Sequence, residues 1–138
     1  MAEARLTPAK GARPLSPHLQ IYKPMLTMMM SIAHRISGAA LYYGMLFLAW
    51  WLLAAASGPN AYGKFQWFMG SPVGILILVG VTFALLLHAL GGIRHLIWDL
   101  GYGFGPVERE WLARATLIGA IALTGVLAIL GFVVAGRA

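Results

Sequence analysis

The chain has 138 residues, of which 60% are hydrophobic and only 10% are charged. A soluble globular domain has about 25% charged residues, so this composition indicates a membrane protein of at most one domain. The net charge of +6 would suit nucleic acid, but the basic residues form no dense run and no aromatics alternate with them, so no nucleic-acid partner is predicted. The absence of cysteine excludes disulfides, thiolate metal sites and cysteine-ligated iron–sulfur clusters within this chain.

Three stretches without Asp, Glu, Lys or Arg are long enough to cross a bilayer, which takes about 20 helical residues. We therefore predict an all-α membrane protein with three transmembrane helices. Ser71 and Pro72 suit the N-cap and first residue of the second helix. The predicted segments are an inner-side N-terminal segment at 1–24, transmembrane helices at 25–56, 72–100 and 113–136, an outer loop at 57–71 and an inner loop at 101–112.

The two connections are predicted as loops. The first reads SGPNAYGKFQWFMGS and is rich in turn-forming residues. Its Tyr62, Trp67 and Phe68 suit the membrane–water interface. The second, GYGFGPVERE, is shorter and also turn-like.

The distribution of basic residues predicts the orientation. One side of the membrane holds the N-terminal segment and the second connection, which carry Arg5, Lys10, Arg13, Lys23, Arg109 and Arg114. The other side holds only Lys64 and Arg137. The positive-inside rule therefore puts the N-terminus in the cytoplasm, or in the matrix of a mitochondrion, and the C-terminus outside.

Polar residues recur on one face of each of the first two spans, because positions i, i+3, i+4, i+7 and i+11 share a helix face. In the first span they are Ser31, His34, Arg35, Gly38 and Tyr42, and in the second they are His88, Gly91, Gly92, His95 and Asp99. Both polar ends are predicted on the inner side. If the two faces oppose each other, the residues that meet at one membrane level are Ser31, His34, Arg35, His95 and Asp99.

His88 lies about 10 Å deeper in the membrane than His95, from a rise of 1.5 Å per residue. An imidazole at this depth needs a partner. In one interpretation Gly91 and Gly92 let another helix pack closely while His88 hydrogen-bonds across. In the other, the two glycines clear space for a planar ligand such as haem, with His88 coordinating its iron. The residues alone leave both open.

The inner-side polar residues also have two interpretations. Arg35 could extend to the headgroups while Ser31 caps a helix, or both could donate hydrogen bonds to the carbonyl of a quinone. Arg94 points about 120° away from the His88 face, so we expect it at the headgroups or at a partner's carboxylate. No Ser/His/Asp set, intramembrane carboxylate pair or zinc spacing supports a soluble type of catalysis. A small transporter or assembly subunit, with histidines in proton-relay or packing roles, stays a further alternative.

Two segments resemble a known family. RPLSPHLQIYKP (Arg13–Pro24) followed by SIAHRISG (Ser31–Gly38) resembles the first signature of the cytochrome b subunit of succinate dehydrogenase, and HALGGIRHLIWDLG (His88–Gly101) resembles the second. They occur in the family's order, on the first and second of three spans. The likeness covers essentially the whole chain. The RPLSPHL form is similar to the alphaproteobacterial and mitochondrial branch.

The resemblance implies an anchor subunit of respiratory complex II within a heteromeric helix bundle. Its expected partners are a second anchor, an iron–sulfur subunit, a flavoprotein subunit and membrane lipid. Expected cofactors are haem b, shared with the second anchor, and ubiquinone as substrate. The expected location is the bacterial inner membrane, which is favoured over the mitochondrial inner membrane. An anchor of a quinol:fumarate reductase is the alternative within the same superfamily.

The resemblance also implies a role for each matching position. His88 is expected to be the haem axial ligand and so the only metal ligand, with its opposite ligand on the second anchor. His34, Arg35 and His95 are expected near the haem propionates, and Ser31 with Arg35 in the quinone pocket. Asp99 is expected in the proton or quinone environment at the inner edge, and no catalytic residue is assigned.

Overall fold

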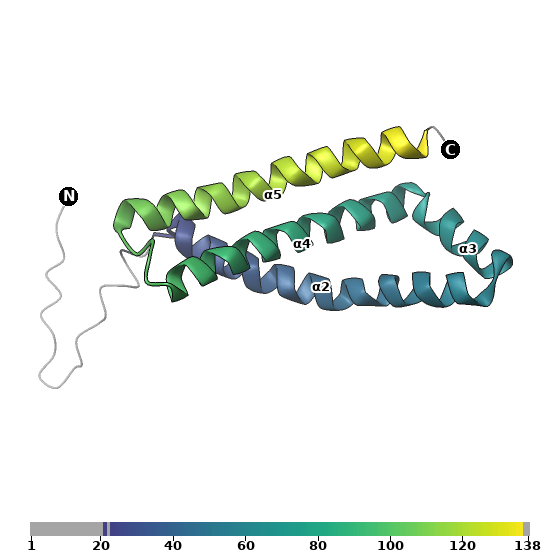
Figure 1. Cartoon of the computed structure of the whole chain (residues 1–138), viewed down its shortest axis with the longest axis horizontal. Coiled ribbons are helices and arrows are strands. Elements are labelled where there is room, and N and C mark those ends of the chain that lie inside the picture. The colour runs from purple at the N-terminus through teal and green to yellow at the C-terminus, as the bar shows by residue number, and fades with distance from the viewer. Residues whose placement is uncertain (1–20, 22, 137–138) are drawn as a thin grey trace, which may run out of the picture.

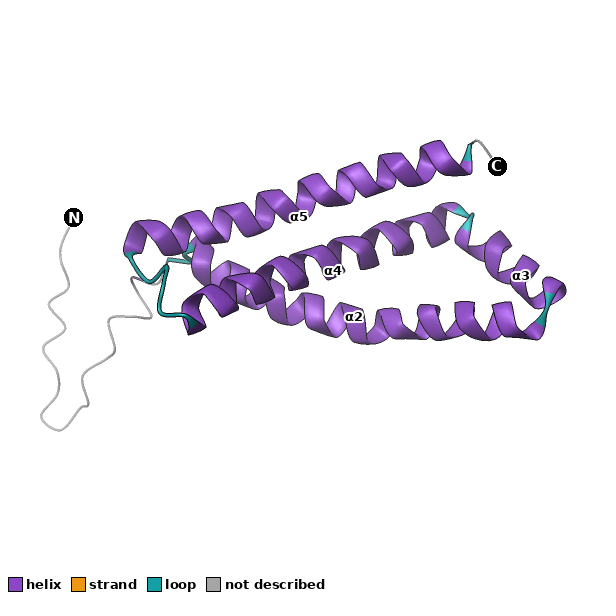
Figure 2. Ribbon diagram, viewed as in Figure 1, coloured by secondary structure: helices purple, strands orange, loops and turns teal. Residues whose placement is uncertain are grey.

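The computed structural model describes residue 21 and residues 23–136, and in this part of the chain it contains helices and no strand (Figure 2). Helix α2 spans Leu26–Ser57, α3 spans Pro59–Met69, α4 spans Pro72–Asp99 and α5 spans Pro106–Ala135. Helices α2, α4 and α5 are long and apolar enough to cross a membrane. The prediction of an all-α protein with three transmembrane helices is therefore confirmed. The segment predicted for 1–24 falls almost entirely outside the described residues.

The three long helices run alternately up and down (Figure 1). Helix α4 packs against both α2 and α5, and α2 meets α5 as well. The start of α2, the end of α4 and the start of α5 lie at one end of the bundle, and α3 joins α2 to α4 at the other (Figure 1). We call these the charged end and the α3 end.

The first connection is a correction to the prediction, because most of it is the helix α3 rather than a loop. Pro59 occupies the first turn of α3, where its fixed φ favours a helix and its missing N–H costs nothing. Aromatic contacts then hold α3 against α2, since the Trp50 ring lies 5.1 Å from that of Phe65 and 5.2 Å from that of Phe68. Gly58, with a φ of 103°, makes the turn before it.

The third long helix begins at Pro106, well before the predicted start at residue 113. The prediction counted only uncharged residues, whereas the first turns of α5 carry charges that themselves stabilise a helix. The Gly105 N–H donates to Glu108 Oε2 at 3.3 Å, which caps the N-terminus. Glu110 and Arg114 form an ion pair of 2.8 Å one turn apart. The second connection is correspondingly short.

A cluster of buried hydrophobic residues joins α2, α4 and α5. Met30, Leu87, Ala113 and Ala120 form the buried cluster, with one residue from α2, one from α4 and two from α5. Small residues let helix backbones approach closely in membranes, where the solvent supplies no hydrophobic drive for association. This cluster joins the three long helices close to the polar residues of α2 and α4.

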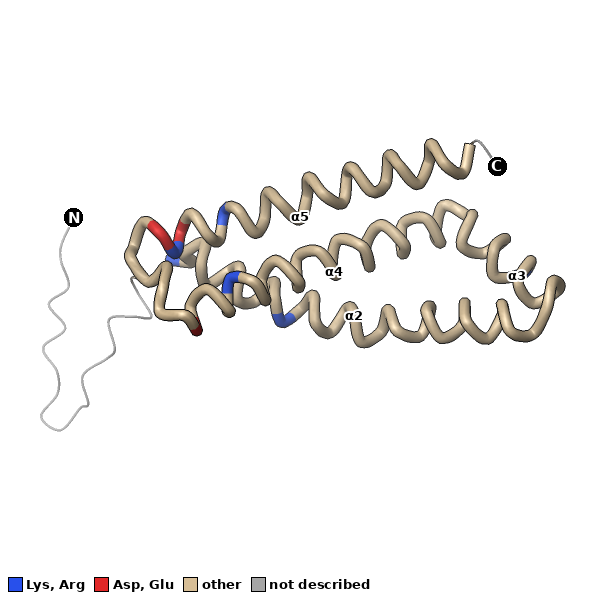
Figure 3. Tube along the Cα trace, viewed as in Figure 1, with Lys and Arg blue, Asp and Glu red and all other residues tan. Residues whose placement is uncertain are grey.

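Charged residues gather at the same end (Figure 3). Asp99, Glu108 and Arg109 lie there, and Lys64 on α3 is the only described charge beyond the other end of the long helices. Large apolar side chains are exposed along all three long helices, such as Leu53, Leu76 and Ile129. Such a surface must be covered by lipid or by other protein.

Candidate functional site

The histidines of the two polar faces lie together. The rings of His34 on α2 and His88 on α4 stack with centroids 4.1 Å apart and an interplanar angle of 11°. Each ring also donates to the backbone of the other helix. His88 Nδ1 lies 3.2 Å from the carbonyl oxygen of His34, and His34 Nε2 lies 3.2 Å from the carbonyl oxygen of His88. The two helices are therefore joined by a reciprocal pair of hydrogen bonds.

Ser37 belongs to this contact, although it lies outside the polar face predicted for the first span. Its side chain is 4% exposed, and Oγ donates to the His34 carbonyl oxygen at 2.7 Å. The same Oγ lies 3.2 Å from His88 Nδ1. Ser37 lies on another face of α2. The buried residues of this face include Met30, Ser37 and Gly44, which follow one another at intervals of seven residues. A small residue repeated in this way is typical of helix packing in membranes.

Glycines make the histidine contact possible. A Cβ on Gly38 would lie 3.1 Å from His88 Cε1, and a Cβ on Gly91 would overlap the His34 ring. The group that lies against Gly91 in this chain is therefore the His34 ring, and the clearance of haem by Gly91 stays a prediction. Gly92 has open space around it, so its role as clearance stays a prediction.

His95 extends the cluster toward the charged end. Its ring lies edge-on to that of His34, with centroids 5.3 Å apart, and edge-on to that of Trp98 at 5.2 Å. The side chain is exposed, unlike the half-buried His34 and His88. The three imidazoles of His34, His88 and His95 therefore form one cluster between the two helices, and His95 is its exposed member.

The other predicted residues lie outside this group. Ser31 and Arg35 are exposed on α2, and Asp99 is exposed at the end of α4. Among the described residues, no hydrogen bond or ion pair joins any of them to the histidines. The structure brings His34, His88 and His95 together and leaves Ser31, Arg35 and Asp99 facing outward.

The expectation for Arg94 is wrong. Its side chain is only 2% exposed, and its guanidinium lies over the Trp98 ring at 5.1 Å, within reach of a cation–π contact. Arg94 continues the buried stripe of α4 that includes Leu87 and Gly91, so it faces the interior of the chain. Within the described residues, Nε and Nη1 have no hydrogen-bond partner.

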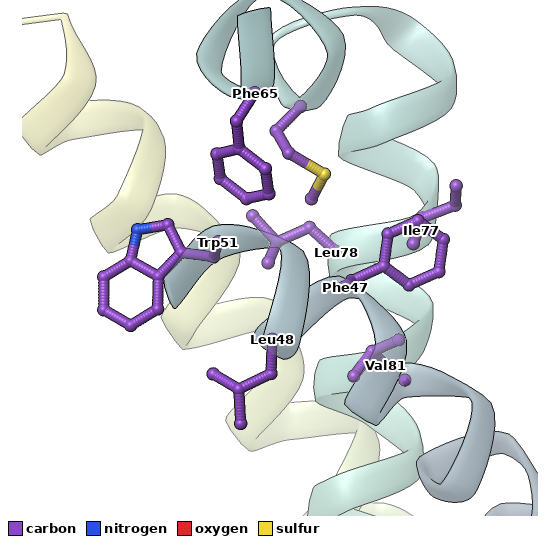
Figure 4. A pocket seen from close by; sticks show the side chains of 9 residues that line it. Phe47, Leu48, Trp51, Phe65, Ile77, Leu78 and Val81 are labelled. Atoms are coloured by element: carbon purple, nitrogen blue, oxygen red, sulfur yellow. The ribbon is translucent and has the colours of Figure 1, made fainter. Parts of the chain in front are cut away.

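A cavity lies away from the histidines, between α2, α3 and α4 (Figure 4). Its volume is about 360 Å³. Apolar and aromatic side chains form its wall: Gly44, Phe47, Leu48, Trp51, Phe65, Met69, Ile77, Leu78 and Val81. It holds no titratable group and so offers no chemistry of its own. No group of three or more His, Cys, Asp or Glu ligands occurs in the described part of the chain.

Three long apolar helices with paired histidines near one end define a multi-span membrane subunit with an intramembrane polar site. Residues 9–129 match the family described as succinate dehydrogenase/fumarate reductase transmembrane subunit. The chain belongs to this family and is a membrane-anchor subunit of the succinate dehydrogenase type. The resemblance found in its two signature segments is thus confirmed.

Curated relatives agree with this assignment. The chain is 40% identical over 124 residues to the succinate dehydrogenase cytochrome b556 subunit of Paracoccus denitrificans, which covers 90% of this chain and 95% of that protein. It is 36% identical over 112 residues to the cytochrome b556 subunit of Rickettsia conorii, covering 81% and 87%. It is 39% identical over 111 residues to the mitochondrial cytochrome b560 subunit of Mus musculus, covering 77% and 63%.

We predict that Gly91→Ala destabilises the α2–α4 contact, because the new methyl group meets a His34 ring that stacking and a hydrogen bond hold in place. Overpacking of this kind costs about 1–3 kcal/mol. The measurement is the thermal stability of the detergent-purified complex. Gly80→Ala on the same helix is the matched control, since a Cβ there meets nothing within 4 Å. Equal stability of the two variants would contradict the prediction.

Proposed function

We propose that this subunit holds haem b through Nε2 of His88. The proposal is based on the hydrogen bonds of the His88 ring. Its Nδ1 is hydrogen-bonded to the His34 carbonyl oxygen and to Ser37 Oγ, whereas no described group bonds to Nε2. A metal-ligating histidine usually has its other ring nitrogen paired in this way. One imidazole from this chain would be enough to hold a haem, because the porphyrin itself carries four nitrogen ligands of the iron. The residues present therefore fit the group.

The remaining histidines support the same assignment. His34 and His95 lie beside His88 on the side toward the charged end, and Arg35, the residue after His34, is exposed on α2. The His95 ring N–H and the Arg35 guanidinium are suitable donors for the haem propionates, whereas the Nε2 proton of His34 is donated to the His88 carbonyl oxygen. Haem supplies one-electron chemistry when it is bound. A histidine of the second anchor subunit would hold the same haem, so that the group would be shared by the two subunits.

We assign Ser31 and Arg35 to ubiquinone. Both side chains lie on α2 near the charged end and are exposed within the described part of the chain. Hydroxyl and guanidinium donors suit a quinone carbonyl, and ubiquinone takes up two electrons and two protons to become ubiquinol. Asp99, exposed at the end of α4, lies where such protons arrive from the water. The rest of this pocket is assigned to the partner subunits.

The complex and its setting follow from the same assignment. Electrons come from succinate through a flavoprotein and an iron–sulfur subunit, which dock at the charged end. The membrane is assigned as the bacterial inner membrane, with the N-terminus in the cytoplasm. The family also contains fumarate reductase anchors, and direction depends on the catalytic subunits and the quinone rather than on this chain. Family membership gives no support to a small transporter.

Replacement of the proposed ligand tests the haem assignment. In His88→Ala the iron loses its ligand from this chain, and we expect the b-type band in the reduced-minus-oxidised spectrum of the purified complex to be lost or strongly changed. Leu85→Ala, one turn earlier on α4 at an exposed position, should keep the band. An unchanged band in His88→Ala would overturn the assignment.

Replacement of the proposed quinone residues separates two activities. Ser31→Ala or Arg35→Ala removes a donor to the quinone carbonyl, so we expect quinone reduction to fall by about 10-fold or more, equivalent to one hydrogen bond to a polar ligand. Succinate oxidation by an artificial dye should stay near the wild-type rate. The exposed neighbour Ile32, as Ile32→Ala, is the control. Equal loss of both activities would indicate failed assembly and contradict the assignment.

A reporter fusion tests the orientation. A reporter joined after Ala138 should give a periplasmic signal, because the positive-inside rule places the more basic side in the cytoplasm. A second reporter, inserted after Tyr102 in the short connection between α4 and α5, should give a cytoplasmic signal. The reverse pair of signals would show that the chain is inserted the other way round.

A further inference from the structure

The hydrogen bonds around His88 determine which ring nitrogen carries the proton. A carbonyl oxygen accepts hydrogen bonds and cannot donate them. The His34 carbonyl oxygen lies 3.2 Å from His88 Nδ1, so Nδ1 must be the donor. The nearby Ser37 hydroxyl has one proton and donates it to the same carbonyl oxygen, at 2.7 Å. Toward Nδ1, at 3.2 Å, Ser37 Oγ can therefore only accept.

We propose that Ser37 is a positioning residue for His88. Together with the His34 carbonyl it gives the Nδ1 proton two acceptors, which keeps the neutral ring protonated on Nδ1 and leaves the lone pair on Nε2. This inference rests on the proposed function, because it concerns the nitrogen assigned to haem iron. It goes further in stating which side chain of this subunit sets the tautomer and the donor strength of that nitrogen.

The surrounding contacts prevent the ring from taking another orientation. The ring of His88 stacks on that of His34 at 4.1 Å, which restricts rotation out of its plane. A Cβ on Gly38 would come within 3.1 Å of His88 Cε1, so the ring edge lies directly against the α2 backbone at this point. His34 is held in turn by its own bond to the His88 carbonyl oxygen. Only the Nε2 edge is left for a ligand.

The hydroxyl has a measurable consequence for a bound haem. An acceptor on the Nδ1 proton makes the imidazole a stronger donor through Nε2. A stronger donor stabilises ferric over ferrous iron and lowers the midpoint potential of the haem. Loss of the Ser37 acceptor should therefore raise this potential, whereas loss of an ordinary buried hydroxyl should not.

The test compares Ser37→Ala with Ser37→Thr in the complete complex. We expect the haem midpoint potential to shift upward and the electron paramagnetic resonance signal of the ferric haem to change in Ser37→Ala, with both restored in Ser37→Thr. The control is Thr124→Ala, because Thr124 is a buried hydroxyl that donates to the Ala120 carbonyl oxygen at 2.7 Å with no histidine beside it. An unchanged or lower potential in Ser37→Ala overturns the proposal, as does an equal shift in Ser37→Thr.

Two further outcomes are distinguishable. If Ser37→Ala does not assemble with haem, Ser37→Cys is measured instead, because a thiol keeps the volume but accepts weakly. An upward shift there supports the proposal, and an unchanged potential overturns it. The haem assignment itself is judged separately, by the band in His88→Ala. A lost band in that variant, combined with an unchanged potential in Ser37→Ala, leaves His88 as the ligand and removes the role of Ser37.

Discussion

The reciprocal contact between His34 and His88 is the constraint on which the rest of the site depends. Two imidazoles inside a membrane must each find hydrogen-bond partners, and here each donates to the backbone of the opposite helix. The contact requires the two helices to approach closely, and Gly38 and Gly91 allow it. A glycine on each helix therefore faces a histidine on the other. This arrangement fixes the register between α2 and α4 and with it the direction in which the free edge of His88 points.

The positions of the long helices could be predicted from the sequence, but their inward faces could not. Hydropathy and the absence of charge locate a span without any knowledge of its neighbours, and Ser71 with Pro72 marks the start of α4 locally. A helix that is apolar all round gives no such signal for its faces, because lipid and protein neighbours accept the same side chains. The angle between Arg94 and His88 therefore predicts an outward position, although Arg94 continues the buried face of Leu87. The α3 helix has no comparable signal in the sequence, because its contacts with Trp50 are tertiary.

The candidate site was predictable in its histidines and not in its supporting residues. His34, His88 and His95 stand out because imidazoles are rare among apolar residues, and helical spacing places them on faces that can meet. Ser37 is small and common, and its significance comes from a carbonyl oxygen and a ring nitrogen that only the folded pair of helices brings within reach. A glycine at position 91 indicates that another group lies close to the α4 backbone, but the sequence does not say which group this is. That group is His34 of the same chain.

The candidate site residues differ in whether this chain itself holds their side chains in place. His88 is oriented entirely by groups of its own chain, through Ser37, the His34 carbonyl and the stacked ring. In the proposed haem site, Nε2 of His88 is already oriented before a second subunit arrives, which lowers the entropic cost of forming that site. Ser31 and Arg35 are exposed and face outward within the described part of the chain. The quinone site proposed at these residues thus depends on assembly, whereas the orientation of the proposed haem ligand belongs to this subunit alone.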